Sequence, residues 1–118
     1  MGILLDNKKL IELNNNEYKL EWFNEGKEGW EKYIGMVVKS NIAQSWGYGK
    51  AKKKSEGWRV RRGLIRHNSN VIAIFQALEK SLFSFKIIRI NRGPLIINGN
   101  NNFEIKYNIY RVLQKKIK

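Results

Sequence analysis

The residues best suited to chemistry in this chain are the lysines and arginines between positions 50 and 67. In this segment, KAKKKSEGWRVRRGLIRH, four lysines precede four arginines, and the only acid is Glu56. Arginine can hold a phosphate or a guanine edge through two parallel hydrogen bonds, whereas lysine binds phosphate as a mobile point charge. The pattern predicts a flexible lysine-rich loop followed by an arginine-bearing strand, which is typical of a surface that grips a nucleic-acid backbone.

The predicted interface combines this segment with two later arginines. Arg59 and Arg61 should project from one side of the strand, and Arg62 and Arg66 from the other, so one face must open to solvent or ligand. Trp46, Tyr48 and Trp58 bracket the lysine loop and could stack on exposed bases, although such aromatics more often belong to the core or its rim. The predicted nucleic-acid-binding residues are Lys50, Lys52, Lys53, Lys54, Trp58, Arg59, Arg61, Arg62, Arg66, Arg89 and Arg92.

Charge is distributed unevenly along the 118 residues. Residues 1–31 contain four lysines and seven acids, a net charge of −3, whereas residues 32–118 contain nineteen Lys and Arg and three Glu, a net charge of +16. We therefore expect an acidic N-terminal hairpin extension over 1–31 and a basic nucleic-acid-binding module over 32–118. Such a module repels itself unless a polyanion lies against it, and each neutralised phosphate releases a counterion.

Other partners are considered beside nucleic acid. The basic residues do not form one face of an amphipathic helix, and no apolar run approaches the roughly 18 residues of a membrane span, so we expect no membrane partner. Residues 1–31 could dock on a protein partner or on the basic side of the module itself. A homodimer is also left open.

Residues that could support catalysis are scarce. The chain has one histidine, His67, one aspartate, Asp6, and no cysteine. Hydrolysis of phosphodiesters by a divalent metal needs carboxylates that converge on the ion, and between Lys32 and Phe103 only Glu56 and Glu79 are available, with Glu79 expected on the exposed side of a helix. We therefore predict no catalytic residue, no metal site and no cofactor, and binding rather than catalysis.

Hydrophobic periodicity predicts the α+β class: an antiparallel β-sheet with two packed helices, an αββαββ-like module preceded by an N-terminal β-hairpin. Helices are expected over 30–43, where the β-branched Val37 and Val38 keep a strand possible, and over 71–82, the second capped by Asn68 or Ser69. Strand fragments and a basic loop are expected over 45–57, and a long turn or hairpin around Pro94. The expected strands are the two arms of a hairpin over 8–23, followed by 58–66, 83–90 and 103–109, with a short basic helix or tail over 110–118.

From about Tyr33 onward the order of these pieces resembles one module of the LAGLIDADG homing endonucleases. The stretch KKKSEGWRVRRGLIRHNSNVIAIFQALEKSL is similar to the basic loop, strand and helix of that family, and FEIKYNIYRVLQKKI is similar to its last strand and final helix. The motif helix would be YIGMVVKSN, with Gly35 at the helix-packing position. The resemblance implies a saddle-shaped sheet that holds nucleic acid, but the metal-binding acid of the family would fall on Ser40, so cleavage is not implied.

Taken together, these features predict a non-catalytic nucleic-acid-binding protein. Structured RNA, either intron or ribosomal and within a ribonucleoprotein, is favoured over DNA. The alternative is a homodimeric LAGLIDADG-type DNA endonuclease whose carboxylates would come from Glu25, Glu28 or Glu31. The abundance of Ile, Asn and Lys suggests an AT-rich genome, such as that of an organelle, a virus or a low-GC microbe, and the mitochondrial matrix is the expected location.

Overall fold

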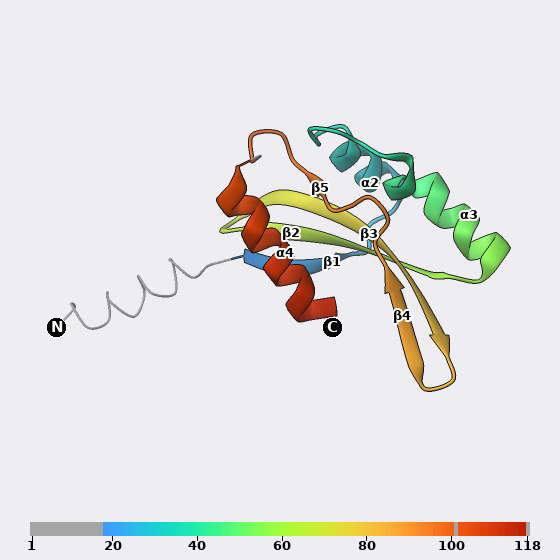
Figure 1. The fold of residues 1–118 in the computed structure, drawn as a ribbon. Helices are drawn as coiled ribbons and strands as arrows, with labels where there is room; N and C mark the ends of the chain where they lie inside the picture. The colour runs from blue at the N-terminus through green and yellow to red at the C-terminus, as the bar shows by residue number, and fades with distance from the viewer. Residues whose placement is uncertain (1–17, 101, 118) are drawn as a thin grey trace.

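An antiparallel sheet with helices on both faces forms the body of the molecule (Figure 1) in a computed structural model that describes residues 18–100 and 102–117. The predicted α+β class with an antiparallel sheet is confirmed. Four strands follow the order β1-β2-β3-β4, and a fifth short strand, β5, pairs with β3. The strands are β1 Tyr18–Phe23, β2 Arg59–His67, β3 Asn70–Leu82, β4 Phe85–Arg89 and β5 Leu95–Ile96.

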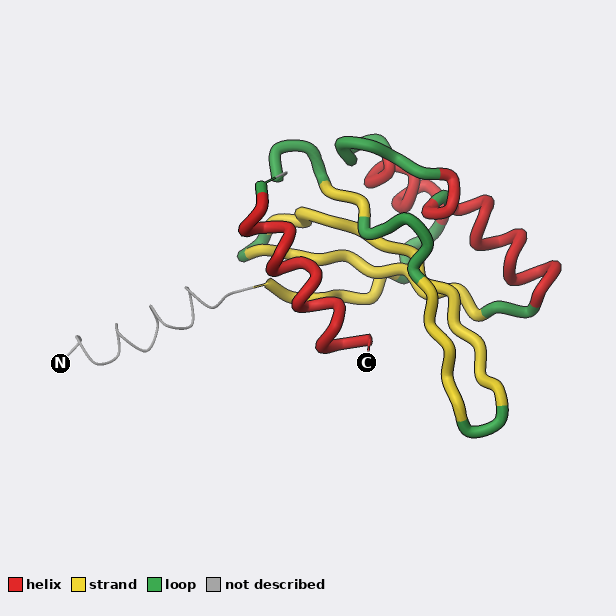
Figure 2. Tube along the Cα trace, viewed as in Figure 1, coloured by secondary structure: helices red, strands yellow, loops and turns green. Residues whose placement is uncertain are grey.

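Helices cover both faces of the sheet (Figure 2), and a hydrophobic cluster lies on each face. Ile65 and Phe75 pack with Ile109 on one face, whereas their neighbours Leu64 and Ile74 pack with Trp30 on the other, because successive strand residues point to opposite sides. The helices are α2 Lys27–Ile34, α3 Trp46–Glu56 and α4 Phe103–Ile117, with a 3₁₀ turn, η1, at Ile42–Gln44. Within the described residues, no helix is both long and apolar enough to cross a lipid bilayer.

The helix predicted over 71–82 is wrong, because this segment is the long central strand β3. Residues 72–79 are all buried, so apolar side chains occupy both faces and the two-residue period of a strand cannot be seen in the sequence. Asn68 and Ser69 accordingly form the turn between β2 and β3 rather than a helix cap, and Asn68 takes a positive φ of 62°. The stretch that the LAGLIDADG resemblance would place in a helix is therefore extended.

The strand predicted over 103–109 is also wrong, because these residues begin α4. Asn102 caps the helix, since its side-chain oxygen accepts the backbone N–H of Ile105 at 2.9 Å. Ile105, Ile109 and Leu113 recur every four residues and pack on the sheet, whereas Phe103 is exposed. The basic helix predicted over the last nine residues is confirmed as the C-terminal part of α4, up to the last described residue.

The N-terminal region differs in part from its prediction. Its second predicted arm is confirmed as β1, which pairs with β2, whereas the first arm lies outside the described residues. Trp30, at the end of the predicted acidic extension, is completely buried in the core below Leu64 and Ile74. The helix predicted over 30–43 ends at Ile34, because the β-branched Val37 and Val38 run extended beside residues 96–97. Strands 58–66 and 83–90 are confirmed as β2 and β4.

Candidate nucleic-acid interface

The lysines predicted to lie in a loop belong to helix α3, so the helix backbone fixes their spacing. The Ser45 hydroxyl accepts the backbone N–H of Tyr48 at 3.1 Å and caps the N-terminus, while Gly57 ends the helix in a left-handed conformation with φ 73°. Lys53 and Lys54 lie in the last turn, where the helix dipole favours positive charge. The strand fragments and loop expected over 45–57 are therefore wrong, although Ser45 and Gly57 are residue types that commonly cap helices.

Gly49 lets α3 lie directly against the sheet. A Cβ atom at this position would be 2.5 Å from Oε1 of Gln76 and 2.8 Å from Nη2 of Arg62, which is closer than atoms can approach. A larger residue here would therefore force the Gln76 and Arg62 side chains to shift. The contact brings the lysines of α3 beside the arginines of β2.

Two buried glutamines fix the segment before α3 to β3. The backbone N–H of Gln76 donates to Oε1 of Gln44 at 2.6 Å, and Nε2 of Gln44 donates to the backbone oxygens of Gln76 and Asn91 at 3.1 and 2.8 Å. Gln76 lies between the part of β3 that pairs with β5 and the part that pairs with β4, so the Gln44 amide replaces a missing strand partner. This satisfies backbone groups that would otherwise be buried without hydrogen bonds.

Arg62 is half-buried between this network and α3. Its Nε donates to Oε1 of Gln76 at 2.8 Å, its Nη2 donates to the backbone oxygen of Trp46 at 3.4 Å, and its guanidinium lies 3.7 Å above the Trp46 ring. These partners are neutral, and within the described residues no carboxylate forms an ion pair with Arg62. Burial lowers the pKa of Arg62 to about 10, because the charged form loses hydration.

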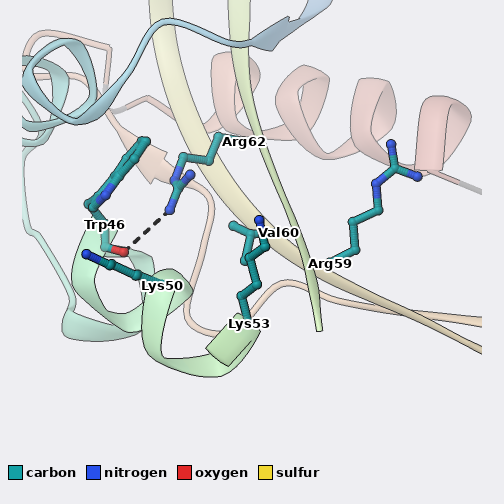
Figure 3. A pocket seen from close by; sticks show the side chains of 6 residues that line it. All are labelled: Trp46, Lys50, Lys53, Arg59, Val60 and Arg62. Atoms are coloured by element: carbon teal, nitrogen blue, oxygen red, sulfur yellow. Dashed lines mark hydrogen bonds between the residues drawn. The ribbon is translucent and has the colours of Figure 1, made fainter. Parts of the chain in front are cut away.

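An open pocket of about 560 Å³ lies between α3 and the start of β2 (Figure 3). β1 ends opposite Arg62, so Arg59, Val60 and Arg61 extend beyond it as an edge of the sheet. In Figure 3 the Arg62 guanidinium faces Trp46, whereas Arg59 points away from the other cations. The pocket is lined by Trp46 and Val60 and by four basic residues, Lys50, Lys53, Arg59 and Arg62; no acid is among the lining residues.

Glu79 lies on the face of the sheet opposite to Arg62 and forms ion pairs with three cations. Contrary to the prediction of an exposed helical residue, it is buried in β3, 3.7 Å from Arg59, 3.5 Å from Arg61 and 3.9 Å from Lys86. The guanidinium of Arg61 also lies 3.7 Å above the Trp22 ring. Arg59 and Arg61 do share one face of the strand, but they are partly neutralised there.

Arg66 lies apart from the pocket. It is seven residues from Arg59, about 23 Å along an extended strand. Its Nε donates to Oε1 of Glu21 at 2.6 Å and its Nη1 donates to the backbone oxygen of Ser69 at 3.1 Å. The hydrogen bond to Glu21 raises the pKa of Arg66 above its ordinary value. The acidic N-terminal region therefore neutralises one of the predicted site residues.

The predicted stacking role of Trp58 does not fit its position. Only 8% of this residue is exposed, its indole N–H donates to Oε1 of Glu56 at 3.1 Å, and Nζ of Lys80 lies 4.5 Å from the ring centre. A base cannot reach a ring that is already covered. Lys52, which forms an ion pair with Glu56 at 2.8 Å, is likewise compensated, whereas Lys54 is exposed.

The two later arginines are separated from each other. Arg89 is exposed with its guanidinium 5.7 Å from the Trp58 ring, close to the C-terminal end of α3. Arg92 instead lines a second open pocket, of about 460 Å³, together with Lys39, Lys106 and Ser40. Sequence reasoning missed Lys39 and Lys106, because three distant segments meet at this pocket and no local pattern links them.

In the part of the chain that the structure describes, no three His, Cys, Asp or Glu side chains are grouped so as to hold a metal ion. Comparison with protein-family models, with curated proteins and with solved structures gives no match for this chain.

Proposed function

We propose that this protein binds nucleic acid, with structured RNA favoured over DNA, and that it acts as a binding component of a ribonucleoprotein rather than as an enzyme. The observation that carries the proposal is the pocket between α3 and β2. Lys50, Lys53 and Arg62 line it and have no ion-pair partner among the described residues, whereas Arg59 also lines it but pairs with Glu79. We base the proposal on this geometry and not on the LAGLIDADG resemblance.

Arg62 supports an anionic ligand most directly. A half-buried guanidinium with neutral partners has lost part of its hydration, which the lowered pKa reflects. A phosphate that enters the pocket restores an opposite charge to Arg62, while Lys50 and Lys53 can reach neighbouring phosphates as flexible cations. The ligand expected from this chemistry is a chain of phosphates rather than a single carboxylate.

The recessed position of Arg62 favours RNA with unpaired segments. Loops and bulges can turn a phosphate or a splayed base into a pocket, whereas the phosphates of a regular duplex follow a continuous convex path. We therefore expect tighter binding to an RNA stem–loop than to a DNA duplex of the same length.

The test measures fluorescence anisotropy of a labelled RNA stem–loop at several salt concentrations. Replacing both lysines, Lys50→Gln with Lys53→Gln, should weaken binding and flatten the plot of log K against log salt by about 1.4 units for two lost single-strand contacts. Arg59 and Arg61 are poorer choices, because their removal takes away two of the three ion-pair partners of the buried Glu79.

The matched control is Lys27→Gln with Lys32→Gln, two exposed lysines of α2 that do not line the pocket. This variant has the same net charge and should keep a salt slope close to that of the wild type. Equal slopes for the two variants would show that binding follows net charge alone. Absence of RNA and DNA binding by the wild-type protein would end the proposal.

A further inference from the structure

The β3–β4 hairpin extends from the body of the molecule as a two-stranded arm (Figure 1). Residues 81–87 are all exposed, although they include three large apolar side chains at the tip. Phe83 is fully exposed and Phe85 is 71% exposed, while Leu82 is also open to solvent. Exposed apolar groups gathered at one projecting point usually mark an interaction surface.

Phe83 is an unusual residue for the turn it occupies. Its φ is 57°, in the left-handed region that glycine and asparagine favour and that bulky side chains rarely adopt. Neither local conformation nor burial explains an aromatic residue at this position. Its exposed ring is available to a ligand.

Strand register places apolar and basic residues on the same face of the arm. Leu82 lies opposite Phe85, Lys80 opposite Ile87, and Leu78 opposite Arg89, so these residues share one face. The cations lie toward the base of the arm, where Lys80 and Arg89 flank the Trp58 ring beside the end of α3. The basic surface of α3 therefore continues onto the arm and ends at its apolar tip.

We propose that the arm inserts its tip between the bases of the bound nucleic acid, with Phe83 stacking on an unpaired base. This inference rests on the proposed function and adds a second element to it. Lys80 and Arg89 contact phosphates at the base of the arm, and Phe83 and Phe85 reach past them to the bases. Apolar side chains that wedge between base steps, and aromatic rings that stack on unpaired bases, are both established modes of nucleic-acid binding.

Charge favours a polyanion over the other two occupants of such an arm. A second copy of the chain would bring Lys80 and Arg89 against the same two residues, and like charges repel. A lipid surface would accept the tip, but it is flat and could not enter the pocket that contains Arg62. A nucleic acid can contact the pocket and the arm together.

The test uses Phe83→Ala with Phe103→Ala as its matched control, because Phe103 is 84% exposed on α4 and neither ring supports the core. The probe is a synthetic RNA stem–loop with 2-aminopurine in its loop. We expect Phe83→Ala to weaken binding about tenfold, as loss of one stacked base does, with an unchanged salt slope. The 2-aminopurine signal should change on adding wild type and less on adding the variant, and Phe103→Ala should behave as wild type.

Two outcomes would overturn the inference while leaving the proposed function intact. In the first, Phe83→Ala binds the RNA as tightly as wild type and gives the same 2-aminopurine signal. In the second, the substitution leaves RNA binding unchanged but abolishes self-association in sedimentation, or binding to phosphatidylserine vesicles, which would assign the tip to a second copy or to lipid. Failure of the wild-type protein to bind either RNA or DNA would overturn both.

Discussion

The two ends of β2 carry arginines in opposite electrostatic situations. At the end near His67, Arg66 forms a 2.6 Å ion pair with Glu21 of β1, and His67 stacks on Tyr18 with ring centres 4.2 Å apart. At the other end, Arg62 contacts only neutral partners among the described residues, beside Lys50 and Lys53 of α3. Arg66 is compensated within the fold, whereas Arg62, on the face that α3 covers, is left for a ligand.

The difference follows from which residues lie next to each arginine. Glu21 of β1 reaches Arg66, whereas β1 places the apolar Phe23 opposite Arg62 and ends there. α3, which carries four lysines, packs beside the uncovered part instead. A basic sequence segment therefore becomes a binding surface only where the topology places no acid against it.

The largest effect is expected from removing the Gln44 hydrogen bonds, which hold the segment before α3 against β3. Gln44→Ala should lower the free energy of unfolding by about 3 kcal/mol, because the backbone N–H and C=O of Gln76 and the C=O of Asn91 lose buried partners. Urea denaturation measures the change. Gln114→Ala, an exposed control on α4, should stay within about 0.5 kcal/mol of wild type. If Gln44→Ala changed the free energy of unfolding as little as the control does, the Gln44 hydrogen bonds would not stabilise the fold.

Glu79→Gln should leave the positive charges of Arg59, Arg61 and Lys86 without their shared counter-charge. The substitution keeps the shape of the buried side chain but removes the negative charge shared by Arg59, Arg61 and Lys86, at a cost of about 1 to 2 kcal/mol of stability. RNA binding should tighten and its salt dependence should steepen, measured by anisotropy as above. Glu104→Gln makes the same charge change at an exposed position of α4 and should have a smaller effect on RNA binding. If Glu79→Gln and Glu104→Gln tightened RNA binding by the same amount, Glu79 would have no local role in binding.

Arg66→Gln tests the compensated end. Because Glu21 already neutralises this guanidinium, we expect the salt slope of RNA binding to stay unchanged and stability to fall by about 0.5 kcal/mol, typical of an exposed pair. A slope that drops as much as it does for the Lys50 and Lys53 variant would show that both ends contact RNA.

The smallest effect concerns the end of α3. Hydrogen bonds from Lys52 and from Trp58 lower the pKa of Glu56, so its charged form stabilises the fold above the ordinary carboxyl pKa of 4.5. This contribution should be present near neutral pH and lost as the pH falls from about 5 through the lowered pKa. The measurement is the difference in unfolding free energy between wild type and Glu56→Gln, which should shrink over that range. A difference that does not vary with pH would exclude the ionic contribution.

Sequence reasoning succeeded where local chemistry alone decided the outcome. The alternating residues of β1, β2 and β4 were recognisable, as was the basic segment that supplies most of the pocket. It failed for β3 because a strand covered on both faces shows no alternation, and for α4 because Phe103 and Tyr107 interrupt the stripe of Ile105 and Ile109 with exposed aromatic residues. The predicted site also does not form one surface, since Arg66 is paired with Glu21 and Arg92 lines a different pocket.

The sequence by itself determined the excess of positive charge after residue 32, the α+β class and the residue types able to hold phosphate. Only the tertiary structure decided which cations stay uncompensated, because compensation depends on distances of a few ångströms between residues far apart in the chain. Glu21 meets Arg66 across a strand pair, and Glu79 meets Arg59 and Arg61 in the same way. Coulomb attraction falls with distance and with hydration, so folding selected the pocket of Lys50, Lys53 and Arg62 from a sequence that is basic almost throughout.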